Sequence, residues 1–124
     1  MSLTPAAFEA VVEEAFASIP TGLRARVENL DVVIEAWPSA VDLEAADVPD
    51  GYTLFGLYTG IPLTERTDGY NMVLPDRITI FRGPLMEAFD DVQRLRAEIR
   101  KTVIHEIAHF FGLSDADLDR LGTV

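Results

Sequence analysis

The chain has 124 residues, of which 48% are hydrophobic and 25% are charged, and it contains no cysteine. This length and composition predict one globular domain over residues 1–124, and they exclude disulfide bonds and thiolate metal sites. The net charge of −11 comes from 21 acidic against 10 basic residues, and it argues against nucleic-acid binding because phosphate backbones would be repelled.

The N-terminal segment is not a secretion signal, because Glu9, Glu13 and Glu14 interrupt its apolar pattern. The longest uncharged run, Gly51–Thr64, contains three glycines and a proline, which makes it a poor candidate for a membrane span. We therefore expect a cytoplasmic protein with no membrane partner.

A helix is predicted near the N-terminus, with Thr4 as its cap and Pro5 in its first turn. Pro20 and Gly22 are expected to end it. Its apolar face comprises Phe8, Val11, Val12, Ala15, Phe16 and Ile19. The following run, Leu30–Ala36, is rich in β-branched residues and predicts a first strand.

The middle of the chain predicts two further strands. The polar stretch Ser39–Gly51 is interpreted as a loop or a weak short helix. Tyr52–Thr59 predicts a second strand, interrupted by Gly56. Arg77–Arg82 alternates between apolar and polar residues and predicts a third strand, ended by Gly83-Pro84.

A long helix is predicted from Asp90 or Asp91 to Phe111. Asp90 followed by Gln93 resembles a capping box at its start, and Gly112 can adopt the left-handed conformation that ends a helix. Its apolar positions are Leu95, Ile99, Val103, Ile107 and Phe110. The order of elements predicts an α+β fold, in which the N-terminal helix and this long helix cover a small mixed sheet of three to four strands.

The only two histidines of the chain lie four positions apart, in the string His105-Glu106-x-x-His109. Four residues turn a helix by about 400°, so both imidazoles project from one side and can bind one metal ion. Glu106 lies beside that position, where zinc hydrolases place their general base. The string therefore predicts a Zn²⁺ site with Glu106 as the catalytic residue.

Asp115 is the predicted third zinc ligand. It follows Gly112 by three residues, and the extended string is similar to the metzincin motif, with aspartate in place of a third histidine. A carboxylate oxygen is an acceptable zinc ligand. The alternative is that Asp115 lies in the first turn of a short helix capped by Ser114, and Asp117 and Asp119 stay open as substitute ligands.

Three segments of the sequence resemble one known family. These segments are residues 54–66, residues 74–85 and the metal motif, and together they look like the small bacterial zincin-like proteins described as candidate zinc metallopeptidases, or minimal metalloproteases. The resemblance implies a zincin-like fold and a single zinc ion. It also implies His105, His109 and Asp115 as ligands and Glu106 as the catalytic position.

The expected function is metal-assisted hydrolysis of a peptide or protein substrate, in which Glu106 accepts a proton from the attacking water. Candidate donors to the developing oxyanion are Tyr52, Tyr58, Tyr70, Arg66, Arg77 and Arg82. Only nine residues follow Asp115, so we expect the lower wall of a deep peptide cleft to be missing. The alternatives are a zinc-binding interaction module without hydrolysis, an enzyme whose cleft a partner chain completes, and a helix that binds no metal.

Overall fold

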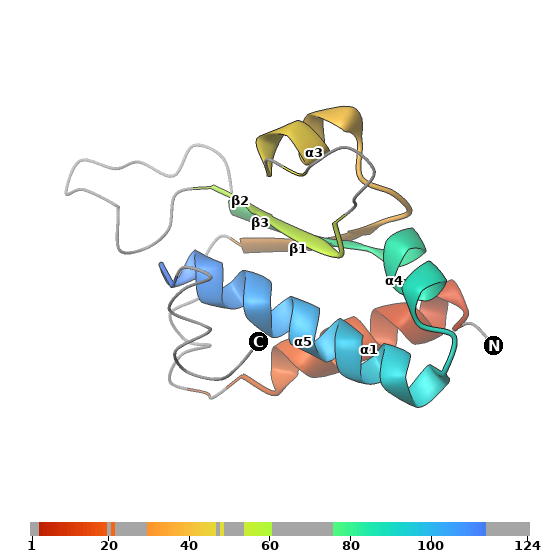
Figure 1. Cartoon of the computed structure of the whole chain (residues 1–124). Coiled ribbons are helices and arrows are strands. Elements are labelled where there is room, and N and C mark those ends of the chain that lie inside the picture. The colour runs from red at the N-terminus through yellow and green to blue at the C-terminus, as the bar shows by residue number, and fades with distance from the viewer. Residues whose placement is uncertain are drawn as a thin grey trace, which may run out of the picture.

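The computed structural model describes residues 3–19, 21, 30–46, 48, 54–60 and 76–113. Over these ranges the helices and strands follow one another in the order α1, β1, α3, β2, β3, α4, α5 (Figure 1). None of the helices in these ranges is both long and apolar enough to cross a membrane.

Strands β1 (Leu30–Glu35), β2 (Gly56–Thr59) and β3 (Asp76–Phe81) form one mixed sheet in the described part of the chain. Their order is β1-β3-β2, with β1 parallel and β2 antiparallel to the central strand β3. Ile78 of β3 lies opposite Val32 on one side and Tyr58 on the other. The predicted α+β class with a small mixed sheet is confirmed, and β2 is an edge strand of the sheet as described.

Helices α1 (Pro5–Ala17) and α5 (Val92–Phe110) pack against each other on one face of the sheet. The short helix α3 (Ala40–Ala45) lies on the opposite side (Figure 1). The core between α1, α5 and the sheet contains the predicted apolar faces, and its fully buried members include Phe8, Val11, Ile78, Ile80, Leu95, Ile99, Val103 and Phe110. This buried layer fixes α5 beneath strands β2 and β3.

The first helix begins as its sequence predicts. Thr4 is the N-cap, its hydroxyl accepts a hydrogen bond from the Ala7 amide at 3.1 Å, and Pro5 is the first helical residue. The polar stretch after β1 forms the short helix and not a loop over Ala40–Ala45, because Ser39 and Asp42 make a complete capping box.

Helix α5 begins one residue later than the proposed capping box requires. The N-cap is Asp91, and its carboxylate accepts a hydrogen bond from the Gln93 amide at 3.3 Å. The Asp90–Gln93 capping box is therefore wrong: Asp91 already accepts from the amide of the second helical residue, as an N-cap aspartate does.

A Schellman motif ends α5. Gly112 has a φ of 92°, as predicted for a glycine that ends a helix. Its amide donates to the His109 carbonyl at 2.9 Å, and the Leu113 amide donates to the Ala108 carbonyl at 3.0 Å. The turn satisfies two carbonyl groups that the helix end would leave unpaired, and it brings Leu113 back over the last turn of α5.

The second strand is shorter than predicted. Leu54 and Phe55 are not part of the strand, and β2 begins at Gly56. The Phe55 carbonyl still accepts a hydrogen bond from the Phe81 amide at 2.9 Å, but the Phe55 ring packs on Phe89 with 5.7 Å between ring centroids. This packing takes Phe55 out of the regular pleat while the chain stays beside β3.

Helix α4 (Arg82–Ala88) follows β3 directly and was not predicted. The strand ends at Phe81, just before the predicted end at Gly83-Pro84, and both of these residues lie in the first turn of α4. Proline is tolerated there because the first amides of a helix have no intrahelical partner. Gly83 also contacts the β1 end closely: its amide donates to the Ala36 carbonyl at 2.7 Å.

Candidate metal centre

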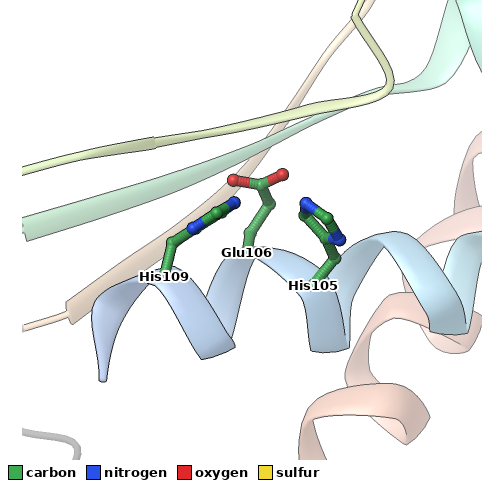
Figure 2. A group of neighbouring side chains, drawn as sticks. All are labelled: His105, Glu106 and His109. Atoms are coloured by element: carbon green, nitrogen blue, oxygen red, sulfur yellow. The ribbon is translucent and has the colours of Figure 1, made fainter. Parts of the chain in front are cut away.

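His105, Glu106 and His109 gather on one side of the last turns of α5. Each side chain offers one ligand atom, and these three atoms all lie within 4.8 Å of one another. Figure 2 shows the side chains pointing from α5 toward the strands, with the Glu106 carboxylate between the two imidazole rings. The rings are 4.7 Å apart between centroids and nearly perpendicular, at 79°. The predicted convergence of the two histidines on one helix face is confirmed.

The ring of His109 is held by the Schellman turn. Its Nδ1 lies 2.8 Å from the carbonyl oxygen of Leu113. A carbonyl oxygen only accepts hydrogen bonds, so Nδ1 carries the proton and donates it. The tautomer therefore leaves the lone pair on Nε2, which is the arrangement of a metal-ligating histidine oriented by a backbone carbonyl.

Glu106 is the most enclosed member of the cluster, with 8% of its surface exposed, while both histidines are half-buried. Edge strand β2 passes directly above it. A Cβ added at Gly56 would lie 3.0 Å from Glu106 Cγ and 2.8 Å from Thr102 Cγ2. Only a residue without a side chain lets the strand backbone come this close to the glutamate.

A cleft of about 330 Å³ adjoins the cluster. One wall is the chain entering β2, and the other is the face of α5 that precedes and includes the first histidine. The cleft is lined by Leu54, Phe55, Gly56, Glu98, Lys101, Thr102, His105 and Glu106. The cleft lies between α5 and the edge of the sheet, and His105 is the histidine that lines it.

Tyr58 is engaged away from this cleft. Its hydroxyl donates to Oδ2 of Asp76 at 3.0 Å, and its ring packs edge-on against Phe110 at 6.0 Å between centroids. A tyrosine has a single O–H hydrogen, and here a carboxylate that is only 2% exposed receives it. In this conformation the Tyr58 hydroxyl donates to Asp76, which favours a structural role for this tyrosine.

The described arginines among the oxyanion candidates also lie outside the cleft. Arg77 is exposed on β3 and adjoins Ile78, which is buried in the core beneath the sheet, so the alternation of the strand points Arg77 to the other face. Arg82 is the first residue of α4 and does not line the cleft. The oxyanion donor therefore has no candidate among these described residues.

Asp115 lies outside the described residues, and so do the substitute ligands and the other oxyanion candidates, Asp117, Asp119, Tyr52, Tyr70 and Arg66. Among the described residues the donor set is two imidazoles and one carboxylate. Nitrogen and oxygen donors of this kind suit zinc, which binds histidine nitrogens and carboxylate oxygens at about 2.0–2.2 Å. The cluster therefore fits a zinc ion, and Asp115 as a third ligand stays a prediction.

Sequence reasoning missed two residues that shape the centre. The Leu113 carbonyl orients His109, and the four-residue spacing across Gly112 is a signal that points to it. Gly56 was identified only as an interruption of a strand, although a glycine within a strand often marks close approach of another part of the chain.

Comparison with known proteins agrees with this geometry. A family model described as a zincin-like metallopeptidase matches residues 27–123. Among solved structures, a conserved hypothetical protein from Thermus thermophilus is similar, with a TM-score of 0.58 and 23% sequence identity over 96% of this chain and 97% of that chain. This second likeness supports the fold alone. No curated protein matches the sequence.

Proposed function

Since the chain belongs to the zincin-like metallopeptidase family, we propose that it is a zinc-dependent peptidase with Glu106 as its general base. His105 and His109 are the proposed ligands from α5, and Asp115 is the proposed third ligand. The observation that carries the proposal is the hydrogen bond from His109 Nδ1 to the Leu113 carbonyl, 2.8 Å long. In the neutral ring this bond leaves the Nε2 lone pair for a metal, and metal-ligating histidines are commonly oriented in this way by a backbone carbonyl.

A zinc ion held by these residues would supply Lewis acidity, which polarises a carbonyl group and lowers the pKa of a coordinated water toward about 7. Glu106 accepts the proton that the attacking water loses, and it then delivers this proton to the leaving amine. Its position supports both steps, because its carboxylate lies between the two imidazoles and under the backbone of β2. The low exposure of this side chain limits the water that competes for the proton.

Edge strand β2 is the proposed platform for the substrate. It pairs with β3 on one side only, within the described sheet, and its entry at residues 54–56 forms a wall of the cleft beside His105. An extended peptide can add to such an edge through main-chain hydrogen bonds. Its scissile carbonyl would then lie above α5, within reach of the Glu106 carboxylate.

Metal analysis and peptide cleavage test the proposal together. We expect about one zinc per chain after reconstitution, lost in His105→Ala and in His109→Ala, and cleavage of a mixed peptide library by the zinc-loaded protein. Glu106→Gln should keep the zinc and lose cleavage by a factor of at least about 100, the usual contribution of a positioned general base. Glu87→Gln removes an exposed carboxylate of α4 outside the cleft and serves as the matched control.

The outcomes separate the proposal from its alternatives. Zinc retention without cleavage by the wild-type chain would favour an interaction module, or an enzyme that needs a partner chain to complete the cleft. Cleavage that persists in Glu106→Gln would remove the glutamate from its proposed role. Absence of stoichiometric zinc in the wild-type chain would contradict the metal site itself.

A further inference from the structure

We propose that the cleft beside the metal centre is a subsite for a carboxylate group of the substrate, and that Lys101 is the specificity-determining residue. The inference rests on the proposed peptidase function and names the substrate class that it would favour. Two sources supply this chemistry: an acidic side chain next to the scissile bond, or the C-terminal carboxylate of a short peptide.

Lys101 lies close enough to the metal centre to contact a bound substrate. It lies on α5 four residues before His105, which corresponds to about 6 Å along the helix axis. Both residues line the same cleft, together with Glu106. A lysine side chain spans a similar length, so its ammonium group can reach a substituent of the residue bound next to the metal, while the scissile bond lies over Glu106.

Lys101 supplies the positive charge that would attract a substrate carboxylate to the cleft. Lys101 is the only lysine in a chain of net charge −11, and no arginine is among the described residues that line the cleft. In the part of the chain that the structure describes, no carboxylate forms an ion pair with it. The ammonium group of Lys101 is therefore available to a substrate carboxylate in the cleft. Other cations on this acidic surface are surrounded by an excess of carboxylates.

Among the described residues, two acidic side chains line the same wall as Lys101: Glu106, the proposed general base beside the metal, and Glu98. Glu98 could oppose this preference. It lies seven residues before His105, about 10 Å along the helix axis, and therefore farther from the metal than Lys101. A substrate carboxylate close to the scissile bond therefore lies nearer to Lys101 than to Glu98. A cationic side chain would have to pass the ammonium group before it reached Glu98.

The opposite wall favours the ion pair. Leu54 and Phe55 present apolar surface where the chain enters β2. Lys101 is exposed, so this apolar surface strengthens a charge pair only modestly relative to one in open water. The combination of one apolar wall and one available ammonium group is that of a pocket for a short acidic residue.

Binding of zinc-chelating probes to the zinc-loaded full chain tests the inference without turnover. The probes are short peptide hydroxamates with Asp, Asn or Lys next to the hydroxamate and an amidated C-terminus, and one Asn probe with a free C-terminal carboxylate. We expect a carboxylate-bearing probe to bind about three- to tenfold more tightly than the amidated Asn probe, the range for a charge-assisted contact in a partly exposed site. Preference for Asp identifies a side-chain source, and preference for the free acid identifies a terminal source.

Variants of two adjacent cations assign the effect. Lys101→Met should abolish the carboxylate preference, Lys101→Arg should retain it, and Lys101→Glu should favour the Lys probe instead. Arg100→Met is the matched control, because Arg100 is the exposed neighbour on α5 and does not line the cleft. It removes the same charge and should leave the preference unchanged.

Equal affinity of the wild-type chain for all four probes would overturn the inference, and so would a carboxylate preference that survives in Lys101→Met. Either result leaves the proposed function standing, since hydroxamate binding itself reports the metal centre. If zinc-loaded chain bound neither these probes nor simple acetohydroxamate, the proposed function and the inference would both be overturned.

Discussion

The imidazole of His109 donates a hydrogen bond to the Leu113 carbonyl oxygen, with 2.8 Å between the two atoms. The bond crosses the turn made by Gly112, so the end of helix α5 and the orientation of a proposed metal ligand depend on the same backbone geometry. A change in the turn is therefore expected to change metal binding.

Substitution of Gly112 by alanine should weaken both stability and zinc binding. A side chain at φ 92° is strained, and the expected loss of unfolding free energy is about 1–2 kcal/mol. Displacement of the Leu113 carbonyl should also lower zinc affinity by about tenfold, the lower end of the range for loss of a group that orients a metal ligand. Urea unfolding and competitive zinc titration measure the two effects. Gly112→Asn, which tolerates the left-handed region better, should lose less of each; equal losses would argue against a conformational cause.

Gly56→Ala should displace the Glu106 side chain, because β2 passes over it at Gly56. The added Cβ would lie 2.8 Å from Thr102 Cγ2 and 3.0 Å from Glu106 Cγ, so β2 or α5 must shift. We expect a loss of about 1–3 kcal/mol in stability, as for overpacking, and a lower kcat with zinc still bound. Thr102→Ser removes Cγ2 and keeps the hydroxyl that donates to the Glu98 carbonyl at 2.8 Å.

The double variant Gly56→Ala with Thr102→Ser should therefore recover part of the lost stability, which a double-mutant cycle measures. If the stability changes of the two single variants simply added up in the double variant, the predicted contact between the new Cβ at position 56 and Thr102 Cγ2 would not form.

Tyr58→Phe should affect stability and leave catalysis alone. The change removes the hydrogen bond to Asp76 and leaves that buried carboxylate with one donor fewer, at a cost of about 1–3 kcal/mol. Because the hydroxyl points to Asp76 and not to the cleft, kcat/KM of the folded, zinc-loaded variant should stay within about twofold of wild type. A drop of a hundredfold or more would return Tyr58 to the role of an oxyanion donor.

Two isoleucines of α5 give a matched test of the packing. Ile99 is fully buried, whereas Ile104 is 44% exposed on the same helix. Ile99→Ala should lower the free energy of unfolding by about 2–5 kcal/mol because it leaves a cavity between α1 and the sheet. Ile104→Ala should change it by less than about 1 kcal/mol. Similar losses in the two variants, measured by urea unfolding, would contradict the placement of α5 over the core.

The local features of the fold were predictable because short-range patterns encode them. The apolar positions of α1 and α5 recur at helical spacing, Thr4 begins the first helix, and Gly112 ends the last one. Helix α4 could not be predicted in the same way. Gly83 and Pro84 are typical of turns, and in the first turn of α4 the Gly83 amide donates to the carbonyl of Ala36, a contact between residues distant in sequence that no local pattern encodes.

The sequence by itself determined which side chains of α5 lie together in the candidate centre. Two histidines four residues apart on a helix must share one face, and Glu106 must lie beside them, because helical geometry alone places these side chains. What only the tertiary structure decided is how the centre is enclosed. The passage of β2 over Glu106 at Gly56, the bond from His109 to Leu113, and the cleft that contains Lys101 all bring together groups whose positions depend on packing or on a turn of the backbone. No periodicity along the chain encodes the contact at Gly56 or the cleft, since both depend on how α5, β2 and β3 pack around one core.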